Sequence, residues 1–234
     1  MPSSIRHFAS LAELSEAAAE MVLAAGQAAV AARGRFALVL AGGATPATLY
    51  RLLAAPPFAA RMPWDKTLFF WGDERCVPPE HPDSNFRIAR ETLLAASPIP
   101  ANNILRIHGE LADPREAASQ YETTIRARLG NAPFDLVLLG MGTDGHVASL
   151  FPGSPLLGES LRLVGVMMEP QGVPPLPRVT LTLAGLNQSR AMLVLISGEE
   201  KRRMLQKIMA QGPASPSPAA RLDPREQLVW LTTE

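Results

Sequence analysis

The chain has 234 residues, of which 47% are hydrophobic, and 22 basic side chains balance 22 acidic ones. A chain of this length buries most of its apolar surface without disulfides or a structural metal. Its single cysteine, Cys76, excludes an intrachain disulfide and fits a reducing, cytosolic compartment. The balanced charge argues against broad binding to nucleic acid or anionic membranes, although a few local cations would suffice for a small anionic substrate. No apolar run approaches the roughly 20 residues of a membrane-spanning helix.

The first predicted element is a helix over residues 11–32. This Ala-rich stretch superficially resembles a signal sequence, but it carries Glu13, Glu16 and Glu20. The apolar region of a signal sequence excludes such charges. The stretch therefore predicts an amphipathic helix.

After this helix, short apolar runs alternate with longer helical patterns. The clearest helix has Asp113 as N-cap, Pro114 at its first position and Gly130 at its end. The Pro/Ser-rich segment 212–218 is too short for a domain linker, so we expect one domain over residues 1–234. Strands are predicted at 36–41, 67–72, 104–107, 134–140, 161–168, 178–183, 191–198 and 228–231, and further helices at 46–54, 83–96, 184–188 and 199–210.

Several predicted strands are apolar at every residue rather than at alternate ones. This pattern indicates burial on both faces, as in a parallel sheet covered by helices, and the strand–helix alternation predicts the same α/β class. Ligands bind beyond the carboxyl ends of the strands in such sheets. Three loops at predicted strand ends are unusual: GGATP (42–46), GDERCVPPEHPDSN (72–85) and GMGTDGHVASLFPG (140–153).

The first loop offers a phosphate cradle. Gly42 and Gly43 let the backbone approach a ligand closely, and Thr45 adds a hydroxyl. Pro46 starts a helix whose free N–H groups favour an anion. An ordinary tight turn between strand and helix explains the same residues. The Gly-Lys-Ser/Thr of a nucleoside triphosphatase is absent.

The third loop matches the dinucleotide fingerprint GxGxxG at Gly140, Gly142 and Gly145. That fingerprint requires a sustained helix after the third glycine, and Pro152 and Gly153 interrupt the chain within two helical turns. We therefore interpret the match as a glycine-rich loop and expect no nicotinamide cofactor.

The same loop carries Asp144 and His146, two residues apart. A turn can place the carboxylate against one imidazole nitrogen, which fixes the tautomer and leaves the other nitrogen free as a base. The alternative is that Asp144 caps a short helix and His146 lies on the surface. The position at a strand end favours the functional interpretation.

Further charged residues stand beside predicted strands. The cluster Asp73, Glu74 and Arg75 could bind sugar hydroxyls and a phosphate. The alternative is that these residues form only an ion-pair network on the surface. Arg178 is a later cation next to a strand. Lys201 lies near the start of a helix, where the dipole disfavours a cation unless an anion is bound.

Other chemistries are weakly indicated. No Gly-x-Ser-x-Gly elbow is present, and a single cysteine such as Cys76 is more often structural than reactive. His81 could approach Asp144 and His146 in space, but the sequence has no close-spaced set of metal ligands.

Taken together, these motifs resemble the 6-phosphogluconolactonase family. The resemblance runs along essentially the whole chain, in the order LAGGATP, WGDERCVPPEHPDSNFRIARE, LVLLGMGTDGHVASLFPGS, RVTLTLAGLN and LISGEEK. It implies a Rossmann-like, three-layer αβα sandwich with a mainly parallel sheet. It also implies hydrolysis of 6-phospho-D-glucono-1,5-lactone to 6-phosphogluconate in the oxidative pentose phosphate pathway, without cofactor or metal.

The resemblance also implies roles for individual residues. His146 would be the base, with Asp144 beside it, and Arg75 would also lie near the substrate. Because the tetrahedral oxyanion needs preorganised donors, we expect the loop N–H groups around Gly142 to Gly145 to supply them. The residues implied around the phosphate are Gly42, Gly43, Thr45, Arg178 and Lys201.

Two other functions are compatible with parts of this sequence. The related glucosamine-6-phosphate isomerase/deaminase family shares GGATP, but would carry an extra lid and a different acidic motif than GDERCVPP. A non-catalytic sugar-phosphate sensor would add a DNA-binding or partner domain, and would be expected to lose the Asp–His pair. We expect a cytoplasmic enzyme, a monomer or small homo-oligomer, with a small-molecule substrate and neither nucleic-acid nor membrane partners.

Overall fold

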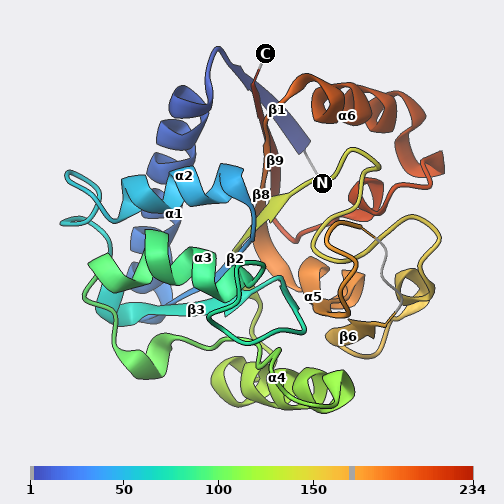
Figure 1. Cartoon of the computed structure of the whole chain (residues 1–234). Coiled ribbons are helices and arrows are strands. Elements are labelled where there is room, and N and C mark those ends of the chain that lie inside the picture. Colours follow the sequence, from blue (N-terminus) through green and yellow to red (C-terminus); the bar gives the residue numbers. More distant parts are fainter. Residues whose placement is uncertain (1–2, 169–171, 234) are drawn as a thin grey trace.

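The core of the computed structural model, which describes residues 3–168 and 172–233, is a six-stranded, fully parallel sheet (Figure 1). The strand order is β1-β9-β8-β5-β2-β3, and all the pairings between neighbours are parallel. The strands are β1 (Ser3–Phe8), β2 (Phe36–Leu40), β3 (Thr67–Trp71), β5 (Phe134–Gly140), β8 (Ser189–Ile196) and β9 (Gln227–Thr233).

Helices cover both faces of this sheet, with α1 and α2 on one side and α6 on the other (Figure 1). The predicted three-layer α/β architecture is therefore confirmed. No helix in the described ranges is long and apolar enough to cross a membrane. The helices are α1 (Leu11–Arg33), α2 (Ala44–Leu53), α3 (Asn85–Thr92), α4 (Pro114–Leu129), α5 (Leu183–Asn187) and α6 (Glu199–Gln211).

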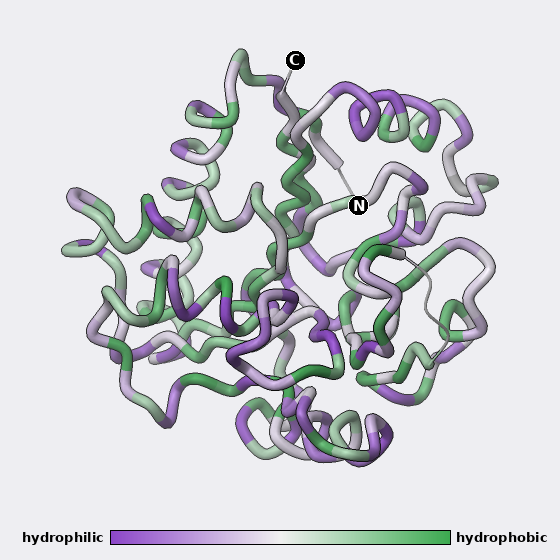
Figure 2. Tube along the Cα trace, viewed as in Figure 1, coloured by the Kyte–Doolittle hydropathy of each residue, from purple (hydrophilic) through white to green (hydrophobic). Residues whose placement is uncertain are grey.

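The inner strands form the apolar centre of the molecule (Figure 2). Every residue of β2 is buried, and so is every residue of β3 at the edge of the sheet opposite β1, which is what their continuous apolar runs predict. Strand β1 was not predicted. It is an edge strand in which Ser3 to His7 are exposed, so its sequence carries no apolar run.

A second sheet, which the sequence did not predict as separate, is antiparallel in the order β4-β7-β6. Its strands are β4 (Asp73–Arg75), β7 (Arg178–Leu181) and β6 (Val164–Met167). Strand β4 was predicted as loop because its three residues are charged. The predicted strand at 104–107 is wrong, because only Ile104 pairs there, in an isolated bridge to Phe69.

Side-chain caps mark the start of two helices, and that of α4 is the predicted Asp113. The Ser84 Oγ accepts the N–H of Arg87 at 3.1 Å at the start of α3. At the start of α4, the Asp113 carboxylate accepts the N–H of Arg115 at 2.9 Å, and Gly130 ends the helix. Local capping chemistry therefore fixes where these two helices begin.

Strand order reverses between β2 and β5. From β2 the chain moves outward to β3, whereas β5, β8 and β9 follow one another in the opposite direction. Open α/β sheets bind ligands in the crevice at such a switch point, beyond the carboxyl ends of the strands. The loops after β2, β3 and β5 therefore meet where a site is expected.

Candidate active site

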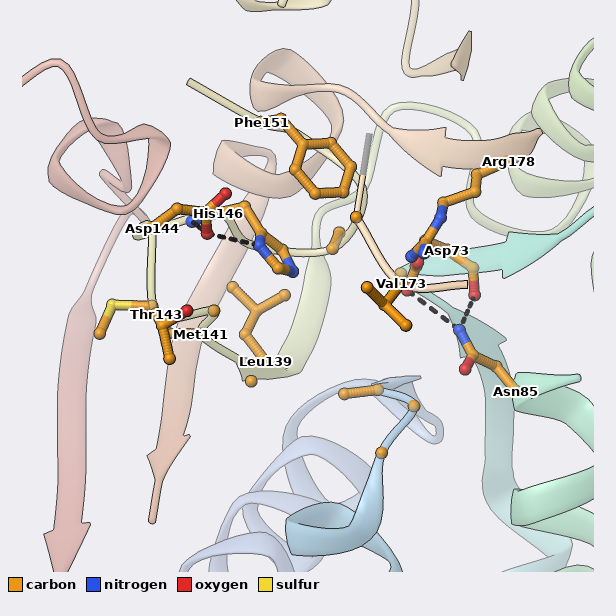
Figure 3. A pocket seen from close by; sticks show the side chains of 18 of the residues that line it. Asp73, Asn85, Leu139, Met141, Thr143, Asp144, His146, Phe151, Val173 and Arg178 are labelled. Atoms are coloured by element: carbon orange, nitrogen blue, oxygen red, sulfur yellow. Dashed lines mark hydrogen bonds and ion pairs between the residues drawn. The ribbon is translucent and has the colours of Figure 1, made fainter. Parts of the chain in front are cut away.

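A cavity of about 510 Å³ lies at this switch point (Figure 3). The loops after β2, β3 and β5 line it together with parts of the β6–β7 connection, β7 and α6. Thr45 and Gly145 are not among the lining residues, so the structure does not place these two predicted positions in the cavity wall. The predicted residues that do line it are Gly42, Gly43, Asp73, Arg75, Gly142, Asp144, His146, Arg178 and Lys201.

The Asp144 carboxylate holds His146 at two points. Its Oδ1 lies 2.6 Å from His146 Nδ1 and accepts the backbone N–H of His146 at 3.1 Å. The other ring nitrogen, Nε2, has no hydrogen-bond partner among the described residues and points away from Asp144 into the cavity (Figure 3). This arrangement is that of an oriented base: the carboxylate fixes the tautomer, and Nε2 remains available to a ligand.

Gly142 makes this pair possible. A Cβ at Gly142 would lie only 2.1 Å from His146 Nδ1 and 2.6 Å from Asp144 Oδ1. Any side chain there would displace the imidazole or the carboxylate. The glycine that matched a dinucleotide fingerprint is therefore needed for the close approach of Asp144 and His146. No sustained helix follows it in the described chain, since the next helical element is the 3-10 turn Pro155–Gly158.

Of the loop N–H groups predicted to stabilise the oxyanion, those of Gly142 and Gly145 are already hydrogen-bonded within the loop. The N–H of Gly142 donates to His146 O at 2.9 Å, and the N–H of Gly145 donates to Gly142 O at 3.1 Å. Both groups therefore stabilise the loop itself. Within the described ranges, the N–H groups of Thr143 and Asp144 make no hydrogen bond, and both residues line the cavity.

Phe151 lies between the base and a buried cation, and it was not predicted. Its ring centroid is 4.5 Å from that of His146, and the guanidinium carbon of Arg178 lies 5.7 Å from the same ring (Figure 3). An apolar residue in a loop gives no sequence signal of such a position. The ring packs against one face of the imidazole and limits its rotation.

Two arginines face each other across the second sheet. Arg75 and Arg178 are register partners of β4 and β7, and like charges directly opposite each other are destabilising. Both Nε atoms are buried with no hydrogen-bond partner among the described residues. Arg178 is only 4% exposed, and burial lowers its pKa, an effect that the charge of Asp73 opposes. Buried, partly unpaired guanidinium groups of this kind favour an anion in the cavity.

Helices α2 and α6 present further donors. Each follows a glycine N-cap, Gly43 or Gly198, with positive φ and no side-chain cap. The first N–H groups of such helices lack intrahelical partners and favour anions. Lys201, in the first turn of α6, lines the cavity as predicted, whereas Lys207 in the same helix does not.

Asp73 is held in a buried network. Its Oδ2 accepts the Ser149 hydroxyl at 2.6 Å. Its main-chain oxygen and Oδ1 accept Asn85 Nδ2 at 2.8 and 3.1 Å, as Figure 3 shows. Asn85, which was not predicted, packs so closely that a Cβ at Gly42 would lie 1.8 Å from its Oδ1. The network therefore joins the loops after β2, β3 and β5.

Glu74 stabilises the fold rather than facing the cavity. Its Oε1 accepts the N–H groups of Arg75 and Asn85, and its Oε2 accepts the Ser84 hydroxyl and the Phe86 N–H, all within 3.0 Å. Burial raises the pKa of Glu74, and the backbone donors partly offset this. The carboxylate therefore ties β4 to the start of α3, which carries Asn85.

The other weakly indicated residues lie outside the cavity wall. Burial raises the pKa of the Cys76 thiol to about 11, which disfavours a reactive thiolate. His81 Nδ1 lies 3.6 Å from Asp83 Oδ2, not beside His146. Within the described ranges, no group of three or more His, Cys, Asp or Glu residues is arranged to hold a metal ion.

Comparisons with known proteins find relatives that match along most of the chain. A family model described as glucosamine-6-phosphate isomerases/6-phosphogluconolactonase matches residues 9–230. The 6-phosphogluconolactonase of Synechocystis is 40% identical over 209 residues, which are 87% of this chain and 84% of that protein. The Mycobacterium bovis enzyme of the same name is 38% identical, over 99% of this chain and 96% of that protein. The crystal structure of 6-phosphogluconolactonase from Thermotoga maritima matches over 100% of both chains, with a TM-score of 0.88 and 34% identity.

Proposed function

The chain belongs to the family of glucosamine-6-phosphate isomerases and 6-phosphogluconolactonases, and we propose that His146 is the base with which it hydrolyses its substrate. Its curated relatives at 35–40% identity are 6-phosphogluconolactonases. The reaction is accordingly hydrolysis of 6-phosphogluconolactone to 6-phosphogluconate in the pentose phosphate pathway. The observation that carries the proposed mechanism is the Asp144–His146 pair, whose free Nε2 faces the cavity.

In the first step, His146 Nε2 takes a proton from a water molecule as the water oxygen forms a bond to the lactone carbonyl carbon. The Nδ1–H of the resulting imidazolium is held by Asp144 at 2.6 Å, which stabilises the new positive charge. The carbonyl π electrons move to oxygen and give a tetrahedral oxyanion. A lactone is an activated ester, so this step requires no covalent enzyme intermediate.

In the second step, the oxyanion re-forms the carbonyl and the bond from carbon to the ring oxygen breaks. The ring oxygen takes the proton from His146 Nε2, which returns the imidazole to its neutral form. The product is an open-chain acid with a free hydroxyl. We propose that the N–H groups of Thr143 and Asp144 donate to the oxyanion, because neither group donates a hydrogen bond to another described residue.

The phosphate is assigned to the cationic part of the cavity. Arg75 and Arg178 are opposed across β4 and β7, and a dianion between them relieves their repulsion. The N–H groups at the start of α2 and the ammonium of Lys201 add donors from two other elements. Binding energy from this remote group orients the lactone carbonyl toward His146.

The remaining expectations stay proposals. We propose one catalytic domain over residues 1–234, because strands of both sheets contribute to the same cavity. We also propose a cytosolic location, a monomer or small homo-oligomer, and no nucleic-acid partner, on the evidence of the single cysteine and the balanced charge.

A direct assay tests the proposed function. The purified chain is mixed with freshly prepared 6-phosphogluconolactone, and the rate of spontaneous hydrolysis is subtracted. Glucosamine 6-phosphate is then offered in place of the lactone. We expect rapid lactone hydrolysis and no ammonia release from the amino sugar. Ammonia release without lactone hydrolysis would show that the chain has the isomerase/deaminase activity of the family and not the lactonase activity.

A further inference from the structure

The Pro/Ser-rich segment near the C-terminus contacts the loop that carries the base. Ser217 is 3% exposed, and its hydroxyl donates to the carbonyl oxygen of Gly145 at 2.8 Å. The N–H of Ala219 donates to the same oxygen at 3.2 Å. We infer that Ser217 is a positioning residue for His146, an inference that rests on the proposed role of His146 as base.

A single peptide group links Ser217 to His146. The Gly145 carbonyl and the His146 N–H belong to the same planar unit. Ser217 holds the oxygen of this unit, and Asp144 Oδ1 holds its N–H at 3.1 Å. Rotation of the plane breaks both hydrogen bonds and turns the imidazole away from Asp144. Ser217, from outside the loop, and Asp144, from inside it, therefore hold the same peptide plane in one orientation.

Packing at this point leaves no room for adjustment. Gly145 has φ +81°, and a Cβ built on it would lie 2.2 Å from Ser217 Oγ. Gly145 is thus required for two reasons, the backbone conformation and the close approach of the serine. The two residues are 72 positions apart in sequence, so only the fold brings them together.

A purely structural role for the hydroxyl is the competing explanation. Ser217 Oγ also accepts the N–H of Ala219 at 3.2 Å, as the N-cap of the 3-10 turn Pro218–Arg221. If capping were its whole role, its removal would lower stability without changing His146. If it positions the base, its removal changes the imidazole and slows turnover in the molecules that remain folded.

Ser217→Ala tests this distinction, with Ser215→Ala as the matched control. Ser215 is 6% exposed in the same segment, and among the described residues its Oγ accepts only the Ser217 N–H, at 3.4 Å. We expect Ser217→Ala to lower kcat about tenfold with KM within about twofold, because small misplacements of a catalytic group are costly. Ser215→Ala should keep both constants within about twofold of wild type.

The imidazole itself provides a readout independent of activity. The chain has only four histidines, so ¹⁵N correlation spectra resolve the ring of His146. We expect a single Nδ1–H tautomer in wild type and in Ser215→Ala, and a mixture of tautomers in Ser217→Ala. Ser217→Thr, which keeps the hydroxyl, should retain more of the wild-type kcat than Ser217→Ala, and thermal unfolding reports the folded fraction of each variant.

The outcomes separate the two claims. Wild-type kcat and a wild-type His146 spectrum in folded Ser217→Ala would overturn the positioning role while leaving the proposed base intact. Equal losses of kcat in the Ala and Thr variants would overturn it as well. Substantial turnover by a His146→Gln variant would instead overturn the proposed function.

Discussion

Asp144 and Asp73 are two carboxylates of one cavity with opposite surroundings. The Asp144 side chain is 48% exposed, and His146 is its only side-chain partner in the part of the chain that the structure describes. Asp73 is 7% exposed and accepts hydrogen bonds from Asn85 and Ser149. The same side chain therefore serves two purposes, after β5 in one case and after β3 in the other. A solvated carboxylate supports an imidazole whose charge changes during turnover, whereas a buried one fixes the wall and faces the cation of Arg178.

Of the two carboxylates, Asp144 should have the larger effect on turnover. In Asp144→Asn the amide no longer stabilises a protonated imidazole, and the preferred tautomer is lost. We expect kcat to fall about 100-fold, the lower part of the range for general acid–base catalysis. Because the side chain is half exposed, the midpoint of thermal unfolding should stay close to wild type. A kcat within about threefold of wild type would remove Asp144 from the mechanism.

At Asp73 the main effect should be on stability. In Asp73→Asn one carboxylate oxygen becomes an NH₂ group that faces the Asn85 amide or the Ser149 hydroxyl. A buried network with one mismatched partner costs about 2 kcal/mol of the free energy of unfolding. Chemical denaturation measures this loss directly. An unchanged unfolding free energy together with a 100-fold loss of kcat would show that Asp73 acts in the chemistry instead.

The anion-binding wall is tested at Lys201. Lys201→Met keeps the length of the side chain and removes its charge, so we expect KM to rise about tenfold with little change in kcat, as for a group that binds substrate and transition state equally. Lys207→Met is the control, since Lys207 lies in the same helix but outside the cavity wall. An unchanged KM for Lys201→Met would remove Lys201 from the phosphate site.

The smallest expected effect is at Ser149. Ser149→Ala removes the 2.6 Å hydrogen bond to Asp73 but leaves Asn85 in place. We expect a loss of about 1 kcal/mol in the free energy of unfolding, the usual net value of one hydrogen bond, and a kcat within about twofold of wild type. A larger loss of kcat would indicate that the Asp73 network also positions the loop of His146.

Much of the fold could be predicted from the sequence, because buried strands have recognisable runs of apolar residues. Strands β2 and β3 and most of β5 are apolar runs, and the caps Ser84 and Asp113 are local chemistry. Strands β1 and β4 were missed because an exposed edge strand and a three-residue charged strand lack any apolar periodicity. Their pairing depends on partners far along the chain.

Some residues of the site could likewise be predicted from the sequence, and others could not. Residues with chemical signatures at strand ends, such as His146, Asp144 and Arg178, were identified from sequence and line the cavity. Asn85, Phe151 and Ser217 were not identified, because an amide, a phenyl ring and a hydroxyl acquire their roles only from tertiary contacts. The oxyanion prediction named Gly142 and Gly145, but which N–H groups a loop uses internally depends on its conformation.

The central claim is that His146 transfers the proton, and His146→Gln tests it most directly. The variant keeps a polar side chain of similar size, and 6-phosphogluconate binding by calorimetry reports whether the cavity is intact. We predict a kcat at least about 1,000-fold below wild type, after subtraction of spontaneous hydrolysis, with product affinity within about threefold of wild type. A kcat within about tenfold of wild type, with product affinity unchanged, would contradict the account.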